Sequence, residues 1–255
     1  MKTARKRRCA GLATLLIVGA WGSQANAQIL TNGGFESGFT GWTRADQVGG
    51  DGTFAIQTGL VSPVNGFAVP APPQGIRAAM TDSGGPGSHI LYQNFVVPVS
   101  VGSATISFSL FINSGDIFVT KSNLNFGETN TAGVQNLNQQ VRVDILRGTV
   151  FDPFSTVVSN TDVLLNLFQT TSASPLVSGY NSIQTNVTSL FQANAGQTLR
   201  IRFAEVDNIA PLNAGVDAVS VTVAPAPEPS SLLLAGSGAL AAFGLTRRRR
   251  RIIPS

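Results

Sequence analysis

Residues 104–112 read ATISFSLFI, and apolar and polar side chains alternate strictly along this stretch. Ile106, Phe108 and Leu110 fall on one face, and the threonine and serines between them fall on the other. A period of two with one polar face is typical of a strand in an antiparallel sheet that packs on one side only. The stretch therefore predicts a half-buried antiparallel strand.

Other stretches repeat this pattern. In residues 199–206 (LRIRFAEV), Arg200 and Arg202 alternate with apolar side chains and are expected on the polar face. Residues 161–168 fit either a strand or a short helix, because their leucines and phenylalanine match both spacings. Further strands are expected at 90–97, 141–146 and 218–223, and one or two helical turns at 187–192.

The segments between these elements are rich in turn-forming residues. Loops are expected at 49–52, 62–75, 83–87 and in the Asn-, Thr- and Gln-rich stretch 121–139. Seven or more short strands joined by polar loops predict a mostly β domain at residues 28–224, folded as an antiparallel two-sheet β-sandwich of the jelly-roll type. A hydrophobic content of 43% excludes a disordered chain, and 27 glycines argue against a helical bundle.

The positive net charge of +4 belongs to the two ends of the chain. Ten of the 17 basic residues lie in residues 2–8 and 247–251. Residues 28–224 hold seven basic and twelve acidic residues, which is a net charge of −5. A nucleic-acid partner is therefore not expected, because nucleic-acid binding requires a basic surface.

Residues 1–27 have the three parts of a secretory signal peptide. The basic stretch MKTARKRR precedes an apolar run at 10–22, and Ala25 and Ala27 are the small residues before a cleavage site that leaves Gln28 as the new N-terminus. We expect a signal helix that the Sec machinery and signal peptidase recognise. The only cysteine, Cys9, precedes the apolar run, so lipidation is not expected and the mature chain has no thiol.

The C-terminus has a second three-part segment at residues 225–251. A Pro-rich linker is followed by an apolar stretch at 232–245, expected to be a transmembrane helix, and by five arginines. The arginines should remain on the cytoplasmic side, which leaves the β domain outside the inner membrane. The apolar stretch is short, which suits a temporary anchor.

This order of parts, with the core Pro227-Glu228-Pro229, resembles the PEP-CTERM sorting signal. The resemblance implies cleavage at the motif by an exosortase, an integral-membrane transpeptidase, in Gram-negative bacteria that make extracellular polysaccharide. It also implies a protein that is exported, held briefly by its C-terminal helix and then located in the envelope or outside the cell. The alternative is an ordinary single-span C-terminal anchor.

Both ends of the β domain resemble galactose-binding-like sandwiches, among them carbohydrate-binding modules. The matching stretches are LTNGGFE at 30–36 with Gly41-Trp42, GQTLRIRF at 196–203 and GVDAVSV at 215–221. The resemblance implies that the first and last strands are neighbours. It also implies a structural calcium, for which Glu36 and Asp217 stand at the matching positions. Ala218 stands where the family usually has a further acidic or amide ligand, so the sequence leaves open whether calcium binds. Asp207-Asn208 in the preceding loop offers other oxygen ligands.

Sugar sites generally need exposed aromatic rings. Trp42 is expected in the core, which leaves Tyr92 and Tyr180 as candidate ligand-binding residues. The single histidine, His89, lies beside a glycine-rich loop and is expected to be solvated. One histidine and no mature cysteine argue against a zinc site built from these ligands.

The sequence therefore predicts a non-catalytic envelope or matrix protein that an exosortase processes and that associates with exopolysaccharide or biofilm. The first alternative is a dedicated carbohydrate-binding module. A remote alternative is an extracellular hydrolase, for which no carboxylate pair stands out among the twelve acidic residues.

Overall fold

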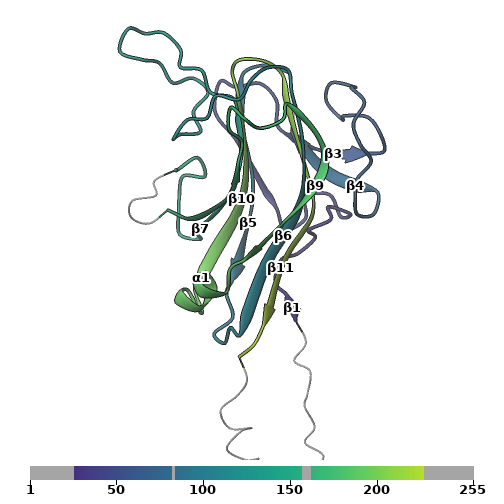
Figure 1. The fold of residues 1–255 in the computed structure, drawn as a ribbon, viewed down its shortest axis with the longest axis vertical. Coiled ribbons are helices and arrows are strands. Elements are labelled where there is room, and N and C mark those ends of the chain that lie inside the picture. Colours follow the sequence, from purple (N-terminus) through teal and green to yellow (C-terminus); the bar gives the residue numbers. More distant parts are fainter. Residues whose placement is uncertain (1–25, 82–83, 157–161, 227–255) are drawn as a thin grey trace, which may run out of the picture. The chain divides into compact units, whose positions relative to one another are not determined.

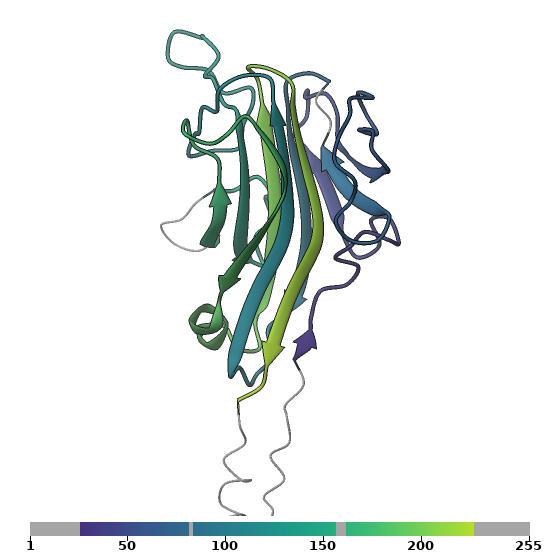
Figure 2. The same ribbon diagram turned by 45° about the vertical axis from the view of Figure 1, so that its right-hand side comes forward.

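Two antiparallel sheets stack face to face in the computed structural model, which describes residues 26–81, 84–156 and 162–226 (Figures 1 and 2). Sheet A has the strand order β3-β4-β11-β6-β9, with β1 paired to β11, and sheet B has the order β2-β5-β10-β7-β8. The strands of sheet A are β1 (Ala27–Gln28), β3 (Phe54–Thr58), β4 (Arg77–Thr81), β6 (Ser103–Ser114), β9 (Val177–Asn186) and β11 (Leu212–Ala224). The strands of sheet B are β2 (Thr43–Asp46), β5 (Gly87–Val96), β7 (Gln140–Arg147), β8 (Val163–Gln169) and β10 (Thr198–Asp207), and helix α1 (Thr188–Ala193) joins β9 to β10.

The predicted sandwich is confirmed, and the strand that suggested it, β6, lies between β11 and β9 in sheet A. Ile106, Phe108 and Leu110 of β6 are at most 2% exposed and face the core. The ring of Phe108 meets that of Phe203 from β10 edge-on, with 5.4 Å between centroids. Burying each such side chain contributes about 1.5–3 kcal/mol, so these inner faces supply much of the stability.

Each strand expected from the sequence is present, and residues 163–168 of the ambiguous segment belong to strand β8 rather than to a helix. The expected helical turns are α1. The pattern did not predict β1, β2, β3, β4 and β9. Strand β9 shows the reason: its sequence, VSGYNSIQTN, is mostly polar and exposed, so it lacks an apolar period. Pairing with β6 decides its structure instead.

The first and last strands of the described domain are neighbours, as the resemblance implied. Ala27 of β1 pairs with Val223 of β11, and the Gln28 side chain accepts a hydrogen bond from Val221 N at 2.8 Å. The expected cleavage site, between Ala27 and Gln28, therefore lies within β1. Residues 1–25 of the signal segment, which include Ala25, and the Pro227-Glu228-Pro229 motif lie outside the described residues.

No helix within 26–81, 84–156 or 162–226 is long and apolar enough to cross a membrane. The segment expected to do so, 232–245, is outside these ranges.

Candidate functional site

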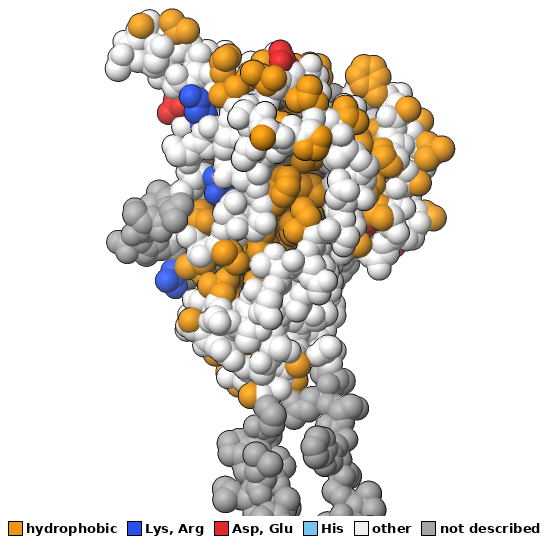
Figure 3. Space-filling view, in the orientation of Figure 1, with side chains coloured by type: hydrophobic (Ala, Val, Ile, Leu, Met, Phe, Trp, Pro, Cys, Tyr) orange, Lys and Arg blue, Asp and Glu red, His pale blue; other side chains and the backbone are white. Residues whose placement is uncertain are grey.

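The outer face of sheet A carries an open groove of about 330 Å³. One wall is the loop at residues 68–70, the other is the start of β9 at 177–179, and Phe111 and Asn113 of β6 lie between them. Apolar side chains cover the loops beside β3 and β4, and few charged groups appear on the face shown in Figure 3. Phe111 is 2% exposed, so it closes the floor and leaves ring stacking to exposed side chains at the rim, while the Asn113 amide can bind a sugar hydroxyl.

Tyr180, a predicted ligand-binding residue, does not line this groove but packs against its floor residue Phe111. Its ring packs against Phe111 with 5.6 Å between centroids, and its hydroxyl donates to Gln57 Oε1 at 2.8 Å. The close approach to β11 requires Gly215, because a Cβ there would lie 2.5 Å from the tyrosine oxygen. Burial, with the charge of Asp217, raises the pKa of Tyr180 far above its ordinary value. The hydroxyl therefore stays neutral.

Two groove residues escaped the sequence prediction. Phe111 and Asn113 follow Ser109 on the polar face of β6, and an aromatic residue in that otherwise polar row is the signal that marks them. The exposed rim adds Phe67 and Val177, which are 58% and 63% exposed. Phe67 directly precedes the loop wall, so its ring is available for stacking.

The structure brings Glu36 and Asp217 together over the turn at residues 74–77. Glu36 Oε1 accepts hydrogen bonds from Ile76 N at 2.9 Å and Arg77 N at 3.0 Å. Asp217 Oδ2 accepts from Gln74 N at 2.8 Å and its Oδ1 from the following amide at 2.6 Å. Three of the four carboxylate oxygens therefore already bind backbone N–H groups.

Burial raises the pKa of Asp217 to about 6, with the charge of Glu36 as a smaller cause. The backbone is unusual here: Asn32, Phe35 and Ala218 have positive φ angles of 53°, 55° and 52°. Ala218 lies in the irregularity between Asp217 and Ser220 of β11, where the register shifts. Bulges of this kind commonly adjoin functional sites.

Tyr92, the other predicted ligand-binding residue, lies on the outer face of sheet B, remote from the groove's lining. The guanidinium carbon of Arg200 stacks 4.0 Å from its ring centroid, and Arg200 Nε donates to Asn94 Oδ1 at 2.8 Å. The ring is half-buried, so Arg200 covers the face that a sugar would need.

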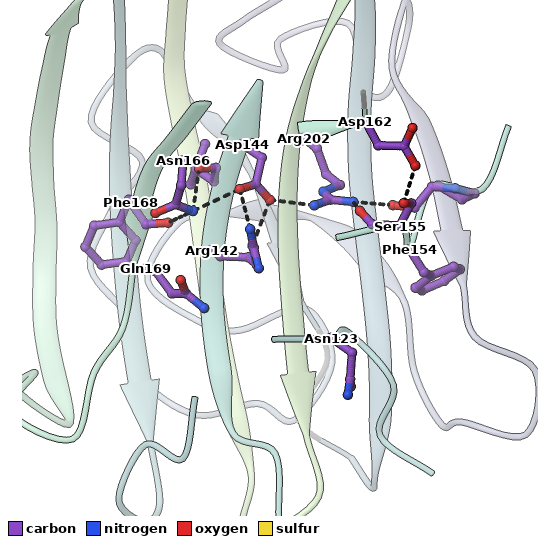
Figure 4. A network of polar contacts seen from close by, with 12 residues as sticks. Asn123, Arg142, Asp144, Phe154, Ser155, Asp162, Asn166, Phe168, Gln169 and Arg202 are labelled. Carbon is purple, nitrogen blue, oxygen red and sulfur yellow. Dashed lines mark hydrogen bonds and ion pairs between the residues drawn. The ribbon is translucent and has the colours of Figure 1, made fainter. Parts of the chain in front are cut away.

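Arg200 and Arg202 lie on the outer, polar face of sheet B, as the alternation predicts, but this face is covered rather than open to solvent. They are 6% and 0% exposed. Arg202 donates to Pro153 O at 2.8 Å and Ser155 O at 2.6 Å, so a loop closes over this face of sheet B (Figure 4).

Asp144 lies between two guanidinium groups beneath that loop (Figure 4). Arg142 binds it through two hydrogen bonds of 2.8 and 2.7 Å, and Arg202 through one of 2.6 Å. Burial alone would raise the pKa of Asp144, but the hydrogen bonds and charges of Arg142 and Arg202 hold it below its ordinary value. The network has the character of a structural ion triad.

His89 is also buried, at 1% exposure, where the sequence indicated a solvated side chain. Strand β5 begins at Gly87 and carries His89 inward between the sheets. Trp42 is 7% exposed and packs against Phe203, as expected of a core residue.

The described domain is thus a mostly β sandwich with an open groove on the outer face of sheet A. Residues 225–251 match the family model of the PEP-CTERM protein-sorting motif. The chain therefore carries this sorting signal, which implies an exported protein that an exosortase processes. No curated protein matches the sequence.

Among solved structures, the chain is similar to TmCBM61 in complex with β-1,4-galactotriose, with 13% identity over 76% of this chain and 97% of that chain and a TM-score of 0.42. It is similar to the K3 adhesin domain of Lys-gingipain from Porphyromonas gingivalis W83, with 12% identity, coverage of 78% and 99%, and a TM-score of 0.44. A cyclase from Fischerella sp. TAU shows 15% identity, coverage of 80% and 100%, and a TM-score of 0.43. These likenesses concern architecture and say nothing of what this chain binds.

Proposed function

We propose that this protein is a non-catalytic envelope or matrix protein that binds extracellular polysaccharide through the groove on sheet A. The observation that carries the proposal is the open groove between residues 68–70 and β9, with Phe111 as floor and the Asn113 amide beside it. The sorting signal at 225–251 supports an extracellular location, and the resemblance to PEP-CTERM proteins implies a producer of extracellular polysaccharide. A dedicated carbohydrate-binding module is the alternative, and both require a glycan to occupy this groove.

The test is affinity electrophoresis of the full chain in gels containing the producing organism's exopolysaccharide. Phe67→Ala removes an exposed ring from the rim and should weaken binding by about 2- to 10-fold, the effect of losing about 0.5–1.5 kcal/mol of stacking. Phe151→Ala is the matched control, because this ring is 100% exposed and belongs to another loop. Equal retardation of both variants and the native chain would remove the groove from the proposal.

The two tyrosines allow a further distinction. Tyr180→Ala should weaken glycan binding because it undermines Phe111, whereas Tyr92→Ala should not, because Arg200 covers that ring. Binding that depends on Tyr92 instead would move the site to sheet B. Saturable binding that free sugars abolish by competition would favour a dedicated carbohydrate-binding module over a general matrix role.

A structural calcium ion at Glu36 and Asp217 is the second, weaker part of the proposal. Calcium takes six to eight oxygen ligands. Here three of the four carboxylate oxygens already accept hydrogen bonds from backbone N–H groups, which leaves fewer lone pairs for an ion. The pair as it stands therefore fits a turn anchor better than a calcium site. A thermal midpoint that is equal in calcium and in chelator would leave only the anchoring role.

Processing is tested by replacing Pro227-Glu228-Pro229 with alanines. We expect the chain to accumulate as an unprocessed precursor in the inner membrane, because the exosortase no longer recognises its cleavage site. Immunoblots of membrane and medium fractions report the size and place of the product. Pro225→Ala, in the same linker but outside the motif, should be processed normally, and a normal product from the triple-alanine chain would contradict the proposal.

A further inference from the structure

Ionisable side chains replace apolar ones on the inner face of sheet B, at the end where β5 begins and β10 ends. The period of two along β10 puts Glu205 and Asp207 on the same face as the core residue Phe203. The register sets Glu205 opposite His89 and Asp207 opposite Gly87. His89, Glu205 and Asp207 are 1%, 0% and 2% exposed. One imidazole and two carboxylates are therefore buried together between the sheets.

These three side chains have the spacing of metal ligands. One ligand atom from each lies within 4.8 Å of the others, and no second group of three such residues occurs in the described ranges. His89 Nε2 is buried and makes no hydrogen bond, and it lies 3.9 Å from Glu205 Oε2. Leaving a buried polar atom without a partner costs about 1–3 kcal/mol, which indicates that this nitrogen serves a ligand.

The other ring nitrogen is fixed by a carboxylate. Asp46 of β2 lies opposite His89 in the register, and its Oδ1 is 2.9 Å from His89 Nδ1. With the proton on Nδ1 donated to Asp46, the lone pair of Nε2 points to Glu205 and Asp207. A carboxylate that orients a histidine in this way is the usual outer partner of a metal-binding imidazole.

The backbone leaves room for an ion at this point. A Cβ on Gly87 would lie 2.4 Å from His89 Nε2 and 2.7 Å from Asp51 O, so only glycine fits beneath the ring. Asp207 also lines a surface pocket of about 200 Å³ with Gly84 and Pro211, which gives an ion a route from solvent.

We propose that His89, Glu205 and Asp207 bind a divalent transition-metal ion, with Zn²⁺ as the best match. Zinc accepts imidazole nitrogen together with carboxylate oxygen, and a doubly charged ion offsets the two buried carboxylates. Three protein ligands leave a further coordination position for water or a small ligand from the pocket. The numbers of histidines and cysteines alone argue against a zinc site. The strand register, which the sequence does not reveal, adds the carboxylates of Glu205 and Asp207 to the single imidazole.

The single histidine makes a direct test simple, because its ring nitrogens give the only imidazole ¹⁵N signals of an untagged chain. The full chain is stripped of metal with a chelator and titrated with Zn²⁺. We expect the Nε2 signal to move with one equivalent of Zn²⁺, the Nδ1 signal to change little, and calorimetry to give one ion per chain. Ring signals that stay unchanged in excess Zn²⁺ would overturn the proposal.

Variants decide whether the carboxylates take part. Glu205→Gln and Asp207→Asn remove one charge each at nearly constant shape and should weaken Zn²⁺ binding at least tenfold. Asp46→Asn, which acts only through His89, should weaken it about 10- to 100-fold. Asp116→Asn, which removes a charge from an exposed carboxylate, is the matched control and should leave the affinity unchanged.

If the charge-removing variants bind Zn²⁺ as tightly as the native chain, the ion is held by His89 alone and the proposed site is wrong. If a variant fails to fold, as judged by circular dichroism, the ¹⁵N titration of the native chain alone decides the proposal.

Discussion

Asp144 on sheet B and Asp217 on sheet A are both fully buried on the outer faces of their sheets, yet their surroundings differ. Two guanidinium groups bind Asp144, whereas backbone N–H groups bind Asp217, with the carboxylate of Glu36 nearby. The pKa of Asp144 is lowered and that of Asp217 is raised to about 6. The loops that cover each outer face determine the surroundings of its polar side chains, and the alternation along a strand does not predict these surroundings.

The largest expected effect is the loss of the charge between the two arginines. Asp144→Asn leaves Arg142 and Arg202 buried without their counter-charge, and this should lower the free energy of unfolding by about 3–5 kcal/mol. Urea denaturation followed by circular dichroism measures the change. The exposed Asp116 provides the matched control, and Asp116→Asn should alter stability by less than about 0.5 kcal/mol.

A loss below about 1 kcal/mol at Asp144 would mean that water reaches the arginines when the charge is removed. The loop at 153–155 would then be a loose cover, and the contrast between the two faces would disappear.

The strands and the core could be predicted because alternation encodes them: the six expected strands are β5, β6, β7, β8, β10 and β11. The covering of the outer faces could not, because it depends on long-range contacts such as Arg202 with Pro153 O, which no local pattern contains. The same limit applies to the sites. Glu36 and Asp217 were paired through a family resemblance, while the cluster around His89 arises from cross-strand register.

A smaller effect separates the two tyrosines. Tyr180→Phe removes the donor to Gln57 Oε1, a buried acceptor, and should cost about 1–2 kcal/mol of unfolding free energy. Tyr92→Phe keeps the ring that Arg200 covers and should change stability by less than about 0.5 kcal/mol. Equal losses in the same urea experiment would show that the hydroxyl contact on sheet A is no more than a surface interaction.

The smallest effect is the pH dependence that distinguishes the two aspartates. Because the folded pKa of Asp217 is raised to about 6 from 3.8, the folded chain binds a proton more tightly than the unfolded chain. The stability that Asp217 contributes is therefore present below pH 4 and is lost as the pH rises through 6. Solvent screening limits the change to on the order of 1 kcal/mol. Asp144, with its lowered pKa, should act in reverse: its contribution is present above pH 4 and is lost as the pH falls further.

Urea midpoints at pH 4, 5, 6 and 7 in the presence of chelator test this difference. Asp217→Asn does not titrate, so the stability of the native chain relative to this variant should fall as the pH rises across the series. The stability relative to Asp144→Asn should stay constant over the same range and decrease only in more acidic solution. If both differences move in the same direction between pH 4 and 7, the carboxylates share one kind of environment, because opposite pKa shifts require opposite signs of linkage.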